Sequence, residues 1–284
     1  MAERSDGFTP PVVVVGIDGS RAGIRAAVWA IDEASSRDIP LRLVSVAEPA
    51  ADTAQGPTSA GARAALHAAA AAVQQTGNPV QAVSEVITGS PTLALLEASR
   101  TAAMVCVGAV GLRHFDHHRL GSTASALVAS AHCPVAVIRG AEPSDPGWVV
   151  VVVDDTPNSA AVLQFAVAEA RLRGAPLRAL GGWQSLHSDA HDTHSVSERN
   201  RLVRARLDRR LSEWQRRYPD LDVQPVAVHG SVLQYLSGNV ASIQLVVVGA
   251  RNVGAVEELL GPPGQAALHG TNCSVLVVDP QRLL

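Results

Sequence analysis

A glycine-rich segment at residues 108–122 holds the residues best suited to chemistry. It reads GAVGLRHFDHHRLGS, a G-x2-G-x9-G-S pattern that follows the apolar run VCV. Glycines let a ligand approach the backbone and let the chain turn at positive φ, and successive main-chain N–H groups in such a loop form an anion-binding concavity. Gly121-Ser122 would open a helix whose free N–H groups suit a phosphate, with Arg113 and Arg119 offsetting part of a triphosphate's charge. The pattern predicts a phosphate site, and a plain glycine-rich surface loop is the alternative interpretation.

Two histidine clusters and one arginine-rich segment are the other candidates. We interpret the histidines as solvated surface residues without a metal site; they are His114, His117 and His118 beside Asp116, and His187, His191 and His194. Residues 199–217 hold eight arginines over an apolar stripe at i+3 or i+4 steps, formed by Val203, Leu207, Leu211, Trp214 and Tyr218. This segment predicts an amphipathic helix with its basic face outward in solvent. A partner-protein or nucleic-acid surface is the alternative.

The charged residues exclude several reaction classes. All 23 basic residues are arginines, so the chain has no Walker-A lysine, no Schiff-base lysine and no kinase strand lysine. The net charge of −3 gives no global attraction to nucleic acid or to anionic membranes, and we expect neither as a partner. No G-x-S-x-G or H-E-x-x-H motif occurs. We therefore expect a binding protein with at most weak ATPase activity.

The cysteines and the lengths of the apolar runs indicate a compartment. Cys106, Cys133 and Cys273 lie in or beside apolar runs and form no C-x-x-C motif, which favours buried thiols over zinc ligands or disulfides. The N-terminal MAERSDGFTPP lacks the basic and apolar regions of a signal peptide. No apolar stretch approaches the roughly 20 residues that span a bilayer. We expect a cytoplasmic protein without membrane contact.

The elements that must position the glycine-rich segment alternate between strands and helices. In the first half we predict strands at 12–17, 41–46, 80–87, 104–107 and 135–138, and helices after Ser20 and at 59–77, 91–100 and 121–131. This alternation predicts a parallel sheet with helices on both faces. Ligands of such sheets bind outside the carboxyl ends of the strands, where the strand order reverses. The loops at 16–20 and 108–122 should therefore lie together.

The sequence contains two similar halves. VVVVGIDGS at residues 12–20 matches VVVVVDDT at residues 149–156, which places Asp18 and Asp154 136 residues apart. Pro40 and Pro176 keep the same spacing. Such repetition indicates two homologous domains. We expect a first domain at 1–140, a linker with two prolines and a glycine at 141–147, and a second domain at 148–284.

These motifs resemble the universal stress protein domain. VVVGIDGS, G-x2-G-x9-G-S and HCPVAVI carry the resemblance, which covers essentially the whole chain in tandem, and the glycine pattern marks the family's ATP-binding branch. The resemblance implies an α/β fold of two Rossmann-like domains of the adenine nucleotide α-hydrolase-like kind. Each would be a five-stranded parallel sheet of order 3-2-1-4-5 with helices on both faces. The resemblance further implies that ATP, with or without Mg²⁺, binds at the switch point of the sheet.

The resemblance also assigns roles to residues of the first half. Gly16 and Asp18 would border the adenosine, and the main chain at Val46 would read the adenine edge. The ribose and phosphates would be wrapped by Gly108, Ala109, Val110, Gly111, Leu112 and Arg113, and the phosphates would be held by Gly121, Ser122 and Thr123. Val110 departs from the family pattern, since relatives often carry a basic or polar residue there. Asp18 has an alternative role in an Asp-Gly-Ser turn before the first helix.

The matching loop of the second half has lost most of these features. It reads GARNVGAVEELLGP at residues 249–262, with Asn252 for the second glycine, an eight-residue spacer and Pro262 for the serine. Proline has no N–H to offer a phosphate. Glu257 and Glu258 add negative charge to the loop.

The strand ends of the second half differ as well. Val152 stands in place of Gly16 and would narrow the approach, while Gly181 and Gly182 replace Ser45 and Val46. We expect the second half to have lost nucleotide binding and to persist as a packing partner.

Together these features favour an ATP-binding stress-response sensor or signalling adaptor, with the nucleotide held mainly by the first domain. A slow nucleotide hydrolase or transferase of the same fold group, and a structural module without nucleotide, are the alternatives. We expect the halves to pack through their fifth strands as an intrachain pseudo-dimer. A homodimer is a further alternative, and the protein partner is unknown.

Overall fold

The computed structural model describes residues 11–47, 58–111, 120–140, 147–184, 193–269 and 271–281. The first half contains β1 (Val13–Gly16), α1 (Arg21–Ser36), β2 (Leu41–Ala47), α2 (Ser59–Gln75), β3 (Ala82–Thr88), α3 (Pro91–Ala98), β4 (Met104–Gly108), α4 (Ser122–Ser130) and β5 (Val135–Ile138). The second half contains β6 (Trp148–Val153), α5 (Ser159–Leu172), β7 (Leu177–Trp183), α6 (Thr193–Arg217), β8 (Val223–His229), α7 (Val232–Asn239), the 3-10 turn η1 (Val240–Ser242), β9 (Ile243–Gly249), α8 (Val253–Leu260), α9 (Pro262–Leu268) and β10 (Ser274–Val278).

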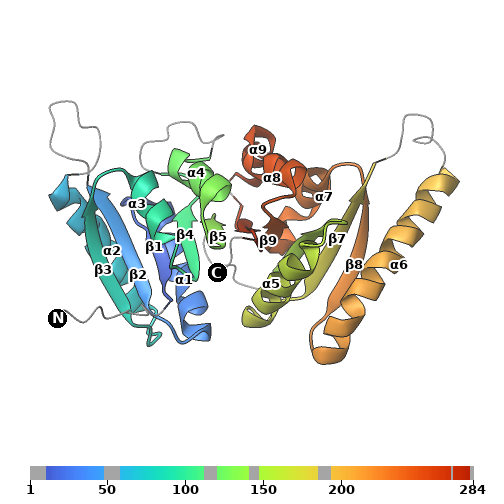
Figure 1. Cartoon of the computed structure of the whole chain (residues 1–284), viewed down its shortest axis with the longest axis horizontal. Coiled ribbons are helices and arrows are strands. Elements are labelled where there is room, and N and C mark those ends of the chain that lie inside the picture. The colour runs from blue at the N-terminus through green and yellow to red at the C-terminus, as the bar shows by residue number, and fades with distance from the viewer. Residues whose placement is uncertain are drawn as a thin grey trace, which may run out of the picture.

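All ten strands belong to one sheet. Their order is β3-β2-β1-β4-β5-β10-β9-β6-β7-β8. Neighbouring strands run parallel except at the centre, where β5 and β10 pair antiparallel and bring Val137 opposite Val275. The expected mostly parallel α/β fold is confirmed, and the halves meet through their fifth strands. Each half contributes five strands, and this central ladder joins them into one sheet. Figure 1 shows the two halves side by side, with β5 and β9 near the middle.

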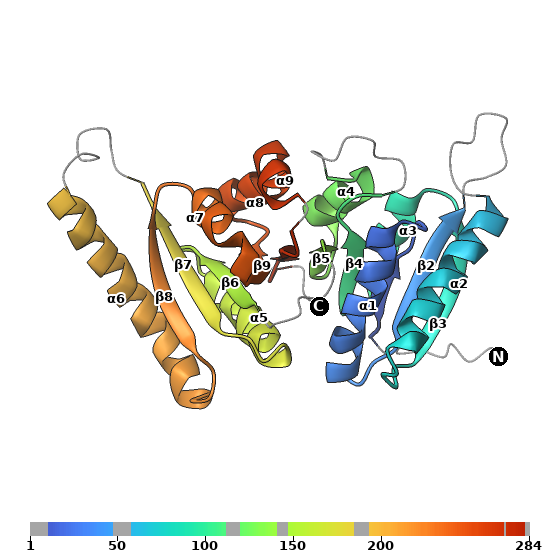
Figure 2. The same ribbon diagram turned by 180° about the vertical axis from the view of Figure 1, so that it is seen from behind.

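Helices cover both faces of the sheet. On one face the core contains side chains of α1, α2, α5 and α6, and on the other it contains side chains of α3, α4, α7, α8 and α9. Figure 2 shows α1 and α2 lying over the first half of the sheet. Successive residues of a strand point to opposite faces. Accordingly, Val13 and Val15 belong to the first core and Val14 to the second.

A buried ionic cluster lies at the junction of the halves. Glu33 of α1 and Arg37, which follows α1, meet Glu169 of α5 and Arg173, which follows α5. Glu33 and Glu169, like Arg37 and Arg173, are separated by the repeat distance of 136 residues. The Arg173 guanidinium lies 2.8 Å from Glu33 and 2.5 Å from Glu169, and Arg37 lies 2.6 Å from Glu33. The side chains of Glu33 and Glu169 are 0% and 1% exposed. The contact of Arg173 with Glu33 thus joins the two halves through a buried ion pair.

This cluster shifts the pKa values of its two carboxyl groups in opposite directions. Burial, and then the charge of Glu33, raise the pKa of Glu169 to about 8. Burial also opposes ionisation of Glu33, but the charges of Arg173 and Arg37 hold the pKa of Glu33 below its usual 4.5. At neutral pH, Glu33 is therefore the ionised member of the pair.

The structure tests what the sequence predicts about the cysteines and about membrane-spanning helices. Cys106, Cys133 and Cys273 are buried free thiols, as expected. In the part of the chain that the structure describes, no helix combines the length and apolarity needed to cross a membrane.

Candidate functional site

A cavity of about 450 Å³ lies at the carboxyl ends of β1, β2 and β4 in the first half. Nine of the predicted site residues line it: Gly16, Asp18, Val46, Gly108, Val110, Gly111, Gly121, Ser122 and Thr123. Ala109 does not, because its N–H and C=O bond to the Ile138 carbonyl and the Gly121 N–H. Leu112 and Arg113 lie outside the described residues, as do Arg119, His114, Asp116, His117, His118, His187 and His191.

Asp18 adopts the turn that was its alternative role, and it also lines the cavity. Its Oδ1 accepts a hydrogen bond from the Ser20 N–H at 2.9 Å across Gly19, whose φ is +87°. Ser20 then caps α1 by accepting from the Gly23 N–H at 3.0 Å. The turn therefore fixes the Asp18 carboxylate at the rim of the cavity, and the two roles are compatible.

Two of the three glycines of the pattern, Gly108 and Gly111, serve close packing, and none of the three has a left-handed backbone. None of Gly108, Gly111 and Gly121 has a positive φ, so the expectation of a positive-φ turn was wrong. A Cβ on Gly108 would lie 2.7 Å from Ala22 of α1. A Cβ on Gly111 would lie 2.7 Å from Asp18 Oδ2. The missing side chains therefore let this segment lie against α1 and beside the Asp18 carboxylate.

The N-terminus of α4 gives the cavity a positive pole. Gly121 is the N-cap residue and makes no side-chain cap, and the first turn contains no acidic residue. Ser122, Thr123 and Ala124 of this turn line the cavity. The first N–H groups of a helix have no intrahelical acceptor and carry partial positive charge. Such a turn is suited to bind an anion.

Sequence reasoning missed the wall that β3 and α3 contribute. Ser90, Pro91, Thr92 and Leu95 line the cavity, although only the loops after the first and fourth strands were considered. Pro91 at the first position of a predicted helix, just after a strand, was the available signal. Leu95 also explains why position 16 is a glycine, because a Cβ there would lie 2.8 Å from Leu95 Cδ1.

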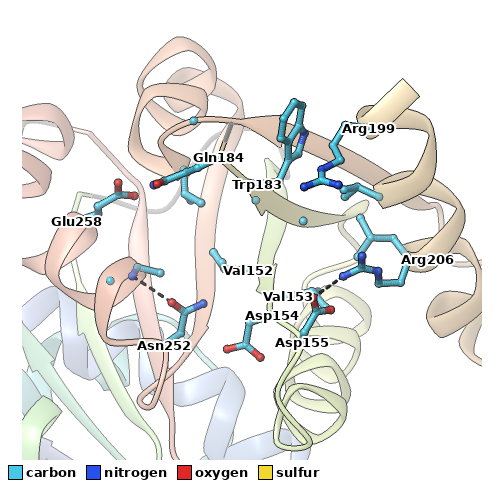
Figure 3. Close-up of a pocket in the computed structure, with 18 of the residues that line it drawn as sticks. Val152, Val153, Asp154, Asp155, Trp183, Gln184, Arg199, Arg206, Asn252 and Glu258 are labelled. Atoms are coloured by element: carbon cyan, nitrogen blue, oxygen red, sulfur yellow. Dashed lines mark hydrogen bonds and ion pairs between the residues drawn. The ribbon is translucent and has the colours of Figure 1, made fainter. Parts of the chain in front are cut away.

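A larger cavity, of about 1040 Å³, occupies the corresponding place in the second half (Figure 3). Val152 lines it without closing it, so the expected narrowing was wrong. The segment predicted as a degenerate loop is largely the helix α8, whose N-cap Asn252 accepts from the Ala255 N–H at 3.2 Å. Asn252 and Glu258 face this cavity.

The start of α9 has lost its anion-binding groups. Pro262 and Pro263 occupy its first positions, so two of its N–H groups are absent. A Cβ on Gly264 would lie 2.2 Å from the carbonyl oxygens of Glu258 and Leu259, which shows how closely α8 packs against this turn. The start of α9 therefore does not give the second cavity the positive pole that the start of α4 gives the first.

Helix α6 supplies a basic wall to the second cavity instead. The predicted apolar stripe is confirmed, with Val203, Leu207 and Leu211 buried. The basic face is not wholly turned to solvent, because Arg199, Arg206 and Arg210 line the cavity. Arg206 pairs with Asp155, and Arg210 donates to the Asp154 carbonyl at 2.6 Å.

Comparison with known proteins identifies the family to which this chain belongs. The model of the universal stress protein family matches residues 11–139 and 148–279, so the chain belongs to that family and carries its domain twice. It is 44% identical over 282 residues to universal stress protein Rv2028c of Mycobacterium tuberculosis, covering 96% of this chain and 98% of that one. It is 45% identical over 283 residues to universal stress protein Rv3134c of the same organism, covering 98% and 100%.

A solved structure shares the fold at low sequence identity. It is a universal stress protein from Archaeoglobus fulgidus, with a TM-score of 0.65 and 15% identity, covering 94% of this chain and 96% of that one. Such a likeness supports the two-domain α/β fold and carries no information on ligands.

Proposed function

We propose that this universal stress protein binds ATP, with or without Mg²⁺, in its first domain. The observation that carries the proposal is the uncapped N-terminus of α4, which faces a cavity at the switch point of the sheet. There the N–H groups and hydroxyls of Ser122 and Thr123 hold the phosphates. Asp18 and Gly16 border the adenosine, and the Val46 main chain reads the adenine edge.

The remaining predicted residues complete this proposed site. The ribose and phosphates are wrapped by Gly108, Ala109, Val110, Gly111, Leu112 and Arg113, and Gly121 begins the phosphate-binding turn. We assign the site to a first domain at 1–140 and a degenerate copy to a second domain at 148–284, joined by the linker 141–147.

Binding without efficient turnover fits the groups in this cavity. Phosphoryl transfer requires metal ligands and a positioned nucleophile. Among the described residues that line the cavity, Asp18 is the one ionisable side chain. We therefore propose a cytoplasmic sensor or signalling adaptor, whose nucleotide-bound state is read by a protein partner.

A charge placed at the phosphate position tests this site. Ser122→Asp adds a carboxylate to the first turn of α4, where it favours the helix but repels phosphate. The control Ser59→Asp adds the same charge to the exposed first residue of α2, outside the cavity. Isothermal titration of the full chain should give one ATP per chain. Affinity should fall about tenfold or more in Ser122→Asp and stay unchanged in Ser59→Asp.

Three results would contradict the proposal. Native protein that neither releases adenine nucleotide to mass spectrometry nor binds added ATP would remove the ATP site altogether. Equal affinity for ATP in Ser122→Asp and Ser59→Asp would show that α4 is not part of the ATP site. Two equivalent ATP sites per chain would show that the second domain kept its site.

A further inference from the structure

Helix α6 lines the second cavity in a way that α2 does not line the first. It has 25 residues, whereas its counterpart α2 has 17. Six of its residues face the second cavity: Arg199, Leu202, Val203, Arg206, Leu207 and Arg210. No residue of α2 lines the first cavity. The second cavity therefore has a wall of its own, which its descent from a nucleotide site does not explain.

Arg199 is a cation held against an aromatic surface on this wall. Its guanidinium lies 5.8 Å from the centroid of the Trp183 ring. Trp183 is fixed in turn, because its Nε1 donates to Asn200 Oδ1 at 2.8 Å and its ring stacks on His229 at 4.3 Å. Within the described part of the chain, no carboxylate forms an ion pair with Arg199. This arginine is therefore available to an anion from solution.

An exposed apolar side chain lies one turn from Arg199. Leu202 is 51% exposed, yet it lines the cavity rather than a flat surface. Val203 and Val232 continue this apolar lining. Apolar surface left open in a concave site, with a few polar groups beside it, is typical of a ligand pocket.

The opposite rim of the cavity is acidic. Figure 3 shows Arg199 and Trp183 on one side and Glu258 across the cavity from them. Glu257 lines the same α8 side. Among the described residues, the first cavity is lined by the N-terminus of α4 and by no glutamate. A polyphosphate in the first domain's orientation would meet these carboxylates and be repelled.

We propose that the second cavity binds a small amphiphilic organic acid. Its single carboxylate pairs with Arg199, and its apolar body lies on Leu202 and the edge of Trp183. The proposal concerns the second domain and does not depend on ATP binding by the first.

Octanoate is a suitable probe for the full chain. Isothermal titration should show one octanoate per chain, and octanol, which lacks the carboxylate, should bind about tenfold more weakly. Arg199→Gln should weaken octanoate about tenfold, and Leu202→Ser should weaken octanoate and octanol alike. The control Arg204→Gln removes an equally exposed arginine of α6 outside the cavity and should leave affinity unchanged. Octanoate should quench the tryptophan fluorescence of the unmodified chain, and this quenching should disappear in Trp183→Phe.

The proposal is overturned if octanoate fails to bind the unmodified chain. It is equally overturned if Arg199→Gln and Arg204→Gln, both shown by circular dichroism to be folded, bind octanoate with the same affinity. Loss of ATP binding in Arg199→Gln would also overturn it, since that would place the nucleotide here. Loss of ATP binding in Ser122→Asp alone leaves it standing.

Discussion

Gly108 and Gly121 belong to the same sequence pattern, but an added Cβ would meet different surroundings at the two positions. At Gly108 it would lie 2.7 Å from both the backbone and the Cβ of Ala22, neither of which can move alone. At Gly121 the nearest atoms are 3.8 and 3.9 Å away, and its φ of −57° suits any residue. The first glycine is therefore required for packing, and the second leaves room beside the helix N-terminus.

Alanine substitutions should separate these two roles. Gly108→Ala should lower the free energy of unfolding by about 1–3 kcal/mol, because α1 must shift away from β4. Gly121→Ala should lower it by only about 0.5 kcal/mol, because alanine is a poorer N-cap residue than glycine. Urea denaturation followed by circular dichroism measures both. Equal losses of stability in the two variants would contradict the packing role of Gly108.

Single residues of the site could be predicted where a contiguous pattern carried them. Asp18 and the G-x2-G-x9-G-S glycines lie together because the carboxyl ends of β1 and β4 are neighbours in the sheet. Ser90 and Thr92 come from another strand end, and no spacing links them to the pattern. The backbone angles could not be predicted either, because close approach and positive φ select glycine equally well.

Two serines at helix starts show how local sequence acts on an element. Ser20 caps α1 through a side-chain hydrogen bond to the Gly23 N–H, whereas Ser90 at the start of α3 makes no such bond. Ser20→Ala should therefore cost about 1 kcal/mol of unfolding free energy, and Ser90→Ala distinctly less. Chemical denaturation gives both values. A loss in Ser90→Ala as large as that in Ser20→Ala would mean that capping is not the cause.

Most helices and strands could be predicted from the hydrophobic periodicity and the capping residues. Helix α8 was not predicted, and its sequence shows why. The segment was matched to the glycine-rich loop of the first half, which hid its own helical signals. Asn252 is a good N-cap, and Val256, Leu259 and Leu260 follow at helical spacing. The match to the first half was followed and the local pattern, which indicates the helix that the structure shows, was overlooked.

The buried ionic cluster at the junction sets a pH dependence for the whole molecule. Folding raises the pKa of Glu169 from its usual 4.5 to about 8, so in this interval the folded chain holds a proton that the unfolded chain releases. The free energy of unfolding contributed by this group is therefore full below pH 4.5 and falls as the pH rises toward 8. The expected fall is on the order of a few kcal/mol.

Glutamine at position 169 mimics the protonated carboxyl group and should remove most of this slope. Urea denaturation at several pH values between 5 and 8 would compare Glu169→Gln with the unmodified chain. Glu97→Gln is the matched control, because it makes the same substitution at an exposed carboxylate paired with Arg100. The assignment would be contradicted if the slope persisted in Glu169→Gln. It would also be contradicted if the free energy of unfolding of the unmodified chain rose between pH 5 and 8.

At the scale of the molecule, repetition predicted the two halves, but the junction needed the structure. The matched positions of Asp18 and Asp154 are visible along the chain. Packing through the fifth strands was expected, but the antiparallel pairing of β5 with β10 into one sheet was not, because it depends on edges far apart in sequence. Glu33 and Glu169 share the repeat distance, yet only their contacts with Arg173 show that they meet.

The central ladder between β5 and β10 joins two copies that are encoded separately within one polypeptide. In an assembly of identical subunits, any substitution appears in every pocket at once, so a change that ruins one pocket ruins them all. Two copies in one polypeptide are not subject to this restriction. They cannot dissociate on dilution, and each pocket can accumulate its own substitutions. Pro262 and the lengthened α6 are changes that this covalently joined pair carries on one side alone.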